Sequence, residues 1–296
     1  MTTSLSVGTT QLGYEQHSSS SVATAARAAV PFVFQHGMGG NTAQPLGYVG
    51  DQPPTPVVCL AARGHVPSDD LTADTASFDV FADDVIALAD HLGLDRFPVG
   101  GISLGAGTAL NLAVRHPDRV SALVLCRPAW LDRPQAELNQ AGYREIADIL
   151  DTLLADGLAD DPSSAAEAAD RYRDESRIYR AVERSSPAAA ASLAGQITRP
   201  RAAHNGVLLR SFPATSPTRS TEPWRRLDVP TLVIGHHDDP FHPYPIAQAY
   251  AEAIPAAQLC TVPSKDADPD GFTQQIRSAL HTFIALHSFI VEAETL

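Results

Sequence analysis

The chain has 296 residues, which is enough for one α/β domain with an insertion and a sizeable buried core. Its 34 acidic and 21 basic side chains give a formal net charge of -13, which disfavours nucleic acid and anionic membranes as partners. The three cysteines lack metal-ligand spacing and are expected as reduced thiols in buried strands, so no metal site is predicted. The first residues show no signal-peptide pattern and no apolar run is long enough to span a bilayer, so we expect a cytoplasmic protein without a membrane partner.

The amino-terminal part begins with weak strand patterns and then turns into a buried strand. Two weak patterns lie around residues 12–15, and the polar tract at residues 18–21 reads as a loose hairpin connection. Residues 31–35 are apolar and predict a buried strand that leads directly into a loop at residues 36–41. Three glycines within four positions of this loop allow backbone amides to approach a ligand closely.

The next elements alternate between strand and helix. Residues 57–60 predict a strand, and residues 78–92 predict an amphipathic helix because their apolar positions recur at helical spacing. A further strand ends at Ser103, which stands between Gly101 and Gly105 in the pattern G-x-S-x-G and is followed by a helical pattern. A sharp strand-to-helix turn strains the serine backbone, and side chains at the flanking positions would collide across it, so glycine is needed there.

The second half of the chain interrupts this alternation. After a strand at residues 120–125, residues 130–224 are alanine-rich, charged, helical in pattern and broken by prolines, which predicts an inserted helical cap. Residues 1–129 and 225–296 would then form the core. The last predicted elements are a strand, a helix, a short strand and a final helix, at residues 229–235, 244–254, 258–262 and 269–290.

The order of elements and motifs resembles the α/β-hydrolase fold over nearly the whole chain. The matching motifs are the glycine-rich loop after the first buried strand, an Arg-Gly-His after the next strand, the G-x-S-x-G turn, and the acidic loop at residues 239–243. The resemblance implies a mostly parallel eight-stranded sheet flanked by helices, with a helical cap inserted between strands. Chemistry in such folds lies at the carboxyl ends of the strands.

The resemblance assigns roles to individual residues. Ser103 matches the nucleophile, and the backbone amides of Met38 and Leu104 match the oxyanion hole. Asp239 is the better match to the catalytic acid, with Asp238 as the alternative.

The histidine of the expected triad is missing from its usual loop. The chain order Ser, Asp, His requires it between the last strand and the last helix, where the sequence has none and Phe272 stands near the matching position. Phe272 is also in phase with the apolar face of that helix. We therefore expect an incomplete triad, with His242, His36 and His65 as possible substitute bases. The predicted pocket residues are His36, Gly37, Gly39, His242 and Phe272.

These residues favour an enzyme that acts on an ester, thioester, lactone or related carbonyl of a small apolar metabolite, without a cofactor. The missing histidine keeps two alternatives open, a non-hydrolytic lyase, cyclase or isomerase and a ligand-binding protein of the same fold. The sequence does not predict the oligomeric state.

Overall fold

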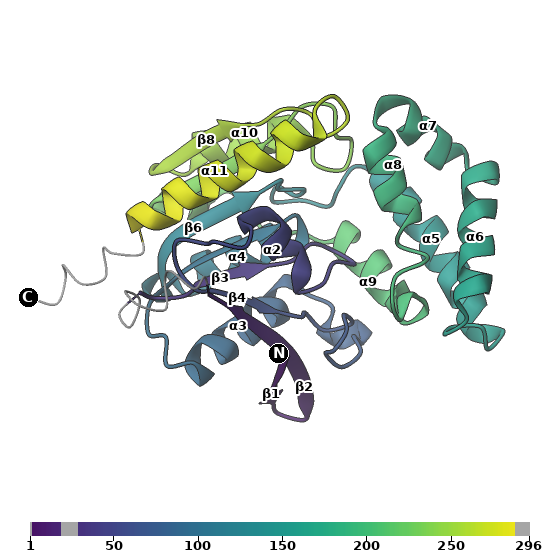
Figure 1. Cartoon of the computed structure of the whole chain (residues 1–296), viewed down its shortest axis with the longest axis horizontal. Helices are drawn as coiled ribbons and strands as arrows, with labels where there is room; N and C mark the ends of the chain where they lie inside the picture. The colour runs from purple at the N-terminus through teal and green to yellow at the C-terminus, as the bar shows by residue number, and fades with distance from the viewer. Residues whose placement is uncertain (1, 19–28, 288–296) are drawn as a thin grey trace, which may run out of the picture.

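The computed structural model describes residues 2–18 and 29–287, and its centre is one eight-stranded sheet (Figure 1). The strand order is β1-β2-β4-β3-β5-β6-β7-β8. The first two strands pair antiparallel with each other, β2 pairs antiparallel with β4, and all other pairs are parallel. The strands are β1 (Thr3–Val7), β2 (Thr10–His17), β3 (Phe32–Gln35), β4 (Val57–Leu60), β5 (Phe97–Ile102), β6 (Val120–Cys126), β7 (Thr231–Gly235) and β8 (Ala257–Thr261).

Helices cover both faces of the sheet. Helices α3, α4 and α10 pack with one set of strand side chains, while α2 and α11 pack with the set that points to the opposite face. The alternation is regular, because Leu123 and Leu125 of β6 belong to the first core and Val124 and Cys126 belong to the second. Outside the insertion, the α-helices of the described residues are α2 (Ala43–Val49), α3 (Phe78–His91), α4 (Leu104–Arg115), α10 (Tyr244–Ala253) and α11 (Pro269–His287).

The α/β alternation predicted from sequence is confirmed, with small shifts of the ends. The main correction concerns the amino-terminal hairpin, whose strands β1 and β2 are joined by a two-residue turn at Gly8 and Thr9. Gly8 has φ of 61°, which favours glycine at such a turn. Ser18 follows β2, so it does not connect the hairpin; the remaining residues of that polar tract lie outside the described residues, as does the end of the predicted final helix.

The described part of the final helix begins as the sequence predicts. The backbone amide of Gly271 donates to Asp268 Oδ1 at 2.9 Å, so Asp268 caps the first turn of α11. Of the three free thiols, Cys59 and Cys126 are buried, whereas Cys260 on β8 is only half-buried. None of the helices in the described ranges is long and apolar enough to cross a membrane.

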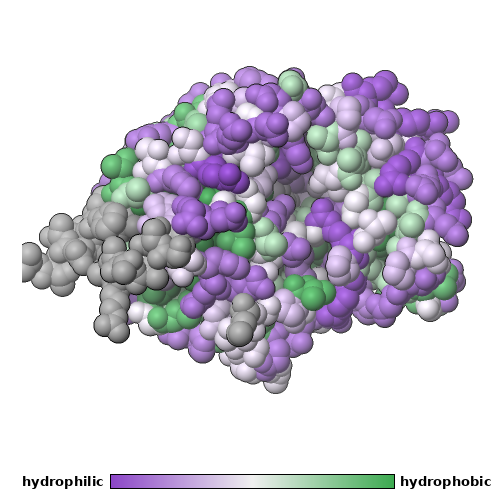
Figure 2. All heavy atoms as spheres, in the orientation of Figure 1, coloured by the Kyte–Doolittle hydropathy of each residue, from purple (hydrophilic) through white to green (hydrophobic). Residues whose placement is uncertain are grey.

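A helical insertion lies between β6 and β7 and stands at one side of the molecule (Figure 1). Its apolar core, which includes Ile146, Leu150 and Leu193, is continuous with Met38 and Leu104 beside the sheet. Figure 2 shows a hollow between the insertion and the rest of the chain, with hydrophilic residues at its edges. The insertion helices are α5 (Glu137–Ala155), α6 (Pro162–Glu175), α7 (Arg177–Ser185), α8 (Pro187–Ala194) and α9 (Gly206–Ser211).

Candidate active site

Ser103 occupies the sharp turn between β5 and α4 that the sequence predicts. Its backbone has φ of 55° and ψ of -107°, a strained conformation for a residue with a side chain. A Cβ on Gly101 would lie 2.1 Å from the carbonyl carbon of Gly105, and a Cβ on Gly105 would lie 2.5 Å from the Gln35 carbonyl oxygen. Both glycines are therefore required for the close packing that places Ser103 above the sheet.

His242, one of the predicted substitute bases, lies in contact with Ser103. Its Nε2 is 2.8 Å from Ser103 Oγ, and its Nδ1 is 2.8 Å from Asp239 Oδ2. A carboxylate oxygen can only accept, so Nδ1 carries the proton and Nε2 is left to accept the serine hydroxyl. Of the three predicted substitute bases, His242 is therefore the one that reaches Ser103, which corrects the expectation of an incomplete triad.

Asp239 is held by the turn that also carries His242. Its Oδ1 accepts the backbone amides of Phe241 at 2.9 Å and His242 at 3.2 Å, so a short local turn fixes acid and base together. Asp239 is buried, whereas Asp238 is exposed and has φ of 66°. The geometry thus favours Asp239 over Asp238 as the partner of the imidazole.

Arg127 is a member of this cluster that the sequence analysis did not single out. It follows β6, and its Nη2 donates to Asp239 Oδ2 at 2.6 Å while lying 3.1 Å from His242 Nδ1. Contacts with His242, His236 and Arg127 hold the pKa of Asp239 far below its usual range despite burial. Burial lowers the pKa of His242, Asp239 opposes this effect and Arg127 adds to it. The sequence did offer a signal for Arg127, because a basic residue directly after a central strand lies at the edge where such sheets place their chemistry.

Phe272 packs in the core and not in the cavity, which corrects its assignment as a pocket residue. Its side chain is 3% exposed and belongs to the cluster with Ile276, Leu280 and Phe283 on α11, as the helical phase predicts. Its ring meets the His236 ring edge-on, with the centroids 5.1 Å apart. Among the described residues that line the cavity around Ser103, Phe272 is absent.

The backbone amides of Met38 and Leu104 are the predicted donors of an oxyanion hole. Met38 lines the same cavity as Ser103, and the Leu104 amide is the first of α4, where a helix leaves its N–H groups without intrahelical partners. Within residues 2–18 and 29–287, neither amide donates a hydrogen bond.

The loop that carries Met38 is braced by two neutral histidines. His36 Nε2 accepts the Ala62 amide at 3.1 Å and its Nδ1 lies 2.8 Å from the Gly37 carbonyl oxygen, while His65 Nε2 accepts the Gly39 amide at 2.9 Å. Burial lowers the pKa of His36 to about 4 and that of His65 to about 3. Both rings are engaged with backbone groups, so they support the loop and do not serve as the base for Ser103.

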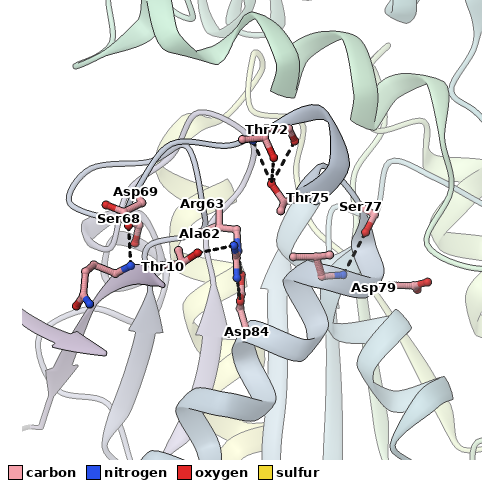
Figure 3. A network of polar contacts seen from close by, with 12 residues as sticks. Thr10, Ala62, Arg63, Ser68, Asp69, Thr72, Thr75, Ser77, Asp79 and Asp84 are labelled. Carbon is pink, nitrogen blue, oxygen red and sulfur yellow. Dashed lines mark hydrogen bonds and ion pairs between the residues drawn. The ribbon is translucent and has the colours of Figure 1, made fainter. Parts of the chain in front are cut away.

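A buried ion pair fixes the segment that carries His65. Arg63 donates to both carboxylate oxygens of Asp84 on α3, each at 2.7 Å, and its Nη1 donates to Thr10 Oγ1 at 2.9 Å (Figure 3). Two parallel bonds to one carboxylate fix the direction of the guanidinium. The Arg-Gly-His motif therefore supports the site without entering it.

The cavity around Ser103 is small and polar. Its volume is about 180 Å³, below the range of roughly 300–1,000 Å³ that is usual for pockets of drug-sized ligands. Gly37 lines it, but His36 and Gly39 do not. The side chains around it are mainly polar, which does not support the apolar ligand that we expected from the sequence. They include Gln44, Tyr48, Tyr143, Ser192, Gln196 and Arg199. In the described ranges, no group of three His, Cys, Asp or Glu side chains could hold a metal ion.

Comparison with known proteins agrees with this architecture. A family model described as the alpha/beta hydrolase fold matches residues 30–266, which is most of the chain. The chain belongs to the α/β-hydrolase fold family. Among curated relatives of this α/β-hydrolase, 3-oxoadipate enol-lactonase 2 from Acinetobacter baylyi is 30% identical over 126 residues, covering 39% of this chain and 46% of the relative.

Other similarities are shorter or more distant. A 2-hydroxymuconate semialdehyde hydrolase from Pseudomonas sp. strain CF600 is 41% identical over 59 residues, covering 20% of this chain and 21% of that protein. The aligned stretches thus span less than half the length of these curated relatives. The structure of a thermophilic esterase from Thermogutta terrifontis superposes with a TM-score of 0.67 and 20% identity, covering 96% of this chain and 99% of that chain, which shows the shared fold.

Proposed function

We propose that this α/β-hydrolase is a serine acyl hydrolase, with Ser103 as nucleophile, His242 as general base and Asp239 as the acid that orients it. The observation that carries the proposal is the unbroken chain of two 2.8 Å contacts from Ser103 through His242 to Asp239. This is the arrangement that a serine needs to become nucleophilic at neutral pH. The names of the relatives, an enol-lactonase and a semialdehyde hydrolase among them, agree with hydrolysis.

The geometry suggests how the reaction would run. As Ser103 Oγ bonds to the substrate carbonyl carbon, His242 Nε2 takes the hydroxyl proton and the carbonyl electron pair moves onto oxygen. The amides of Met38 and Leu104 would receive this oxyanion, and each such donor typically contributes about 10²–10³ in rate. His242 then protonates the leaving group as the bond to it breaks, and water attacks the acyl-enzyme by the same route.

The size and lining of the cavity support a proposal for the substrate class. We propose a small ester, thioester or lactone with polar substituents, because the space is about 180 Å³ and its walls are mainly polar. A hydrophobic substrate would leave these polar side chains desolvated without partners, which costs binding free energy.

We propose further that residues 130–224 act as the cap of this site and residues 1–129 and 225–296 as its core. Gln196 Nε2 and Arg199 Nη1, both from the insertion, donate to the Met38 carbonyl at 3.3 and 3.2 Å. The insertion therefore contacts the very residue whose amide is assigned to the oxyanion hole, and differences in the insertion are expected to change substrate choice.

The alternatives of a non-hydrolytic enzyme or a ligand-binding protein rested on the lack of an imidazole near Ser103. The contact between His242 and Ser103 removes the reason for these alternatives, and one variant tests them directly. A lyase or isomerase that uses the pocket without a covalent step would keep most of its activity in Ser103→Ala, whereas a serine hydrolase would lose it.

The experiment combines covalent labelling with ester turnover. A fluorophosphonate probe should label Ser103, as located by peptide mass spectrometry, and His242→Gln should abolish both labelling and hydrolysis of a neutral 4-nitrophenyl ester. Loss of the base lowers turnover by up to about a millionfold in enzymes with this triad. The matched control is His237→Gln, an exposed imidazole in the same loop, which should leave both readouts unchanged. Turnover that survives in Ser103→Ala or His242→Gln would refute the proposal.

A further inference from the structure

One wall of the catalytic cavity carries a cation that the proposed acyl transfer does not use. Arg199 follows α8 in the insertion and lines the same cavity as Ser103. Its Nη1 donates to the Met38 carbonyl oxygen at 3.2 Å, so the guanidinium stands beside the loop assigned to the oxyanion hole. Gly39 makes room for it, because a Cβ at that position would lie 2.6 Å from Arg199 Nη1.

The cations and anions of the cavity do not balance. Three cationic side chains, those of Arg127, Arg199 and Lys265, face a single carboxylate, Asp239. Arg127 is paired with that carboxylate at 2.6 Å. Among the residues that the structure describes, Arg199 and Lys265 have no ion-pair partner. The nearby Asp266 is occupied elsewhere, by the Ala188 amide at 2.7 Å and the Ser186 hydroxyl.

The Arg199 side chain is half-buried, and a guanidinium in such a place is usually paired with an anion. Burial lowers the pKa of Arg199, and the hydroxyl of Tyr143 is the group that opposes this effect, with no carboxylate contributing. The side chain stays charged because arginine remains protonated at any physiological pH. Its unpaired charge also helps to lower the pKa of His36 and His65. A cation in this position is stabilised when an anion enters the cavity.

We propose that the substrate carries a carboxylate in addition to its scissile carbonyl, and that Arg199 binds this carboxylate while Lys265 attracts it at the cavity edge. The proposal rests on the proposed hydrolase function and names the substrate class of the same site. Because the overall charge of the protein is -13, these cations are what makes the cavity favourable for an anion. Arginine suits the role, since its planar fork matches a carboxylate.

The experiment compares two esters that differ only in charge. The 4-nitrophenyl ester of adipic acid, with its second carboxylate free, is measured against the ester in which that carboxylate is replaced by a primary amide. The wild type should prefer the carboxylate-bearing ester by at least tenfold in kcat/KM. Arg199→Gln should lower kcat/KM for the carboxylate-bearing ester by about 10–100-fold and for the amide ester by less than threefold, as expected for one charge-assisted contact.

Further variants separate charge from structure. Arg199→Lys should restore part of the preference, and Lys265→Gln should cause a smaller loss that weakens as salt is added. Arg184→Gln, an exposed arginine of the same insertion, is the matched control and should change neither ester. If Arg199→Gln lowers kcat/KM equally for both esters, or if the wild type shows no preference between them, the carboxylate subsite is refuted while the hydrolase proposal stands.

Binding to Ser103→Ala keeps the two proposals distinguishable. Calorimetry should show that adipate binds Ser103→Ala and that binding weakens by about 10–100-fold when Arg199→Gln is added. If neither ester is cleaved and the phosphonate does not label Ser103, the hydrolase proposal fails. Adipate binding that depends on Arg199 would still support the anion site in that case, and equal or absent binding would refute it.

Discussion

Replacing Arg127 by methionine tests whether the buried cation beside the triad acts on the chemistry or only on the fold. The guanidinium donates to Asp239 Oδ2 at 2.6 Å and stands 3.1 Å from His242 Nδ1, with the Arg127 side chain 13% exposed and that of Asp239 3% exposed. Methionine keeps much of the apolar length of the side chain and removes the charge. The change therefore leaves a buried carboxylate with fewer partners.

The structure bounds the loss of stability. Removing one partner of a buried ion pair typically costs about 3–5 kcal/mol. The lower end applies here, because Asp239 keeps two backbone amides on Oδ1 and His242 on Oδ2. For a chain of this size, about 3 kcal/mol corresponds to a fall in Tm of roughly 6 °C.

The pH profile of kcat/KM is the decisive assay, because it reports the pKa of the base in the free enzyme. Arg127 lowers the pKa of His242, so its removal should raise that pKa. His242 must be neutral to accept the serine proton, and the acidic limb of the profile should therefore move to higher pH in Arg127→Met. Arg127→Lys, which keeps the charge, should leave the limb close to its wild-type position.

The control for general destabilisation is Arg226→Met. Its side chain is 78% exposed and pairs loosely with Glu222 at 3.7 Å, so stability and pH profile should both be unchanged. If Arg127→Met lowers the Tm but leaves the acidic limb in place, Arg127 acts on the fold alone. If the limb moves to lower pH, the electrostatic assignment is wrong.

Three other variants test the supports of the site. Gly105→Ala would place a Cβ 2.5 Å from a backbone carbonyl at the end of β3 and should cost most of the esterase activity, whereas Gly47→Ala, which meets nothing within 4 Å, should retain full activity and slightly raise the Tm. Asp84→Asn leaves Arg63 with half of a buried pair, so urea unfolding should show a loss of about 3 kcal/mol. Burial lowers the pKa of His65 to about 3 in the folded protein, so as the pH falls below about 6.5 this histidine is protonated in the unfolded chain first. The free energy of unfolding should therefore decrease between about pH 6.5 and about pH 3. His65→Gln should reduce this pH dependence, as measured by urea unfolding at several pH values.

The sequence was most informative where geometry is local. The glycines around Ser103 are needed by the turn itself, and the apolar phase of the last helix placed Phe272 in the core. Strand and helix alternation likewise follows from periodicity, which packing against both faces of a sheet reinforces. These features depend on neighbours in the chain, so the sequence can show them directly.

The sequence could name His242 only as one of three possible substitute bases, because its distance from Ser103 depends on the fold. The family order of the triad residues directs attention to the loop before α11, while His242 lies only three residues after Asp239. Two backbone amides on Asp239 Oδ1 close a turn that lifts the imidazole across the strand ends to Ser103. A His three residues after the acid was visible in the sequence, but its reach depends on how far β5 and β7 are apart.

The cations were harder to foresee. Arg127 and Arg199 come from segments that are 72 positions apart, and nothing in their local sequence indicates that both face one cavity. The expectation of an apolar ligand took no account of these residues. Long-range packing of the insertion on the glycine-rich loop decides the polarity of the cavity.

One short turn carries both the proposed acid, Asp239, and the proposed base, His242, so no other loop needs to supply either group. The stretch between β8 and α11 supplies no group to the proton relay; instead Asp266 fastens it to the start of α8, where the Ala188 amide donates at 2.7 Å. This hydrogen bond couples the stretch between β8 and α11 to the insertion, apart from Ser103, His242 and Asp239. Grafting this pair of segments from one homologue into another should exchange ligand preference while the cleavage machinery is inherited intact.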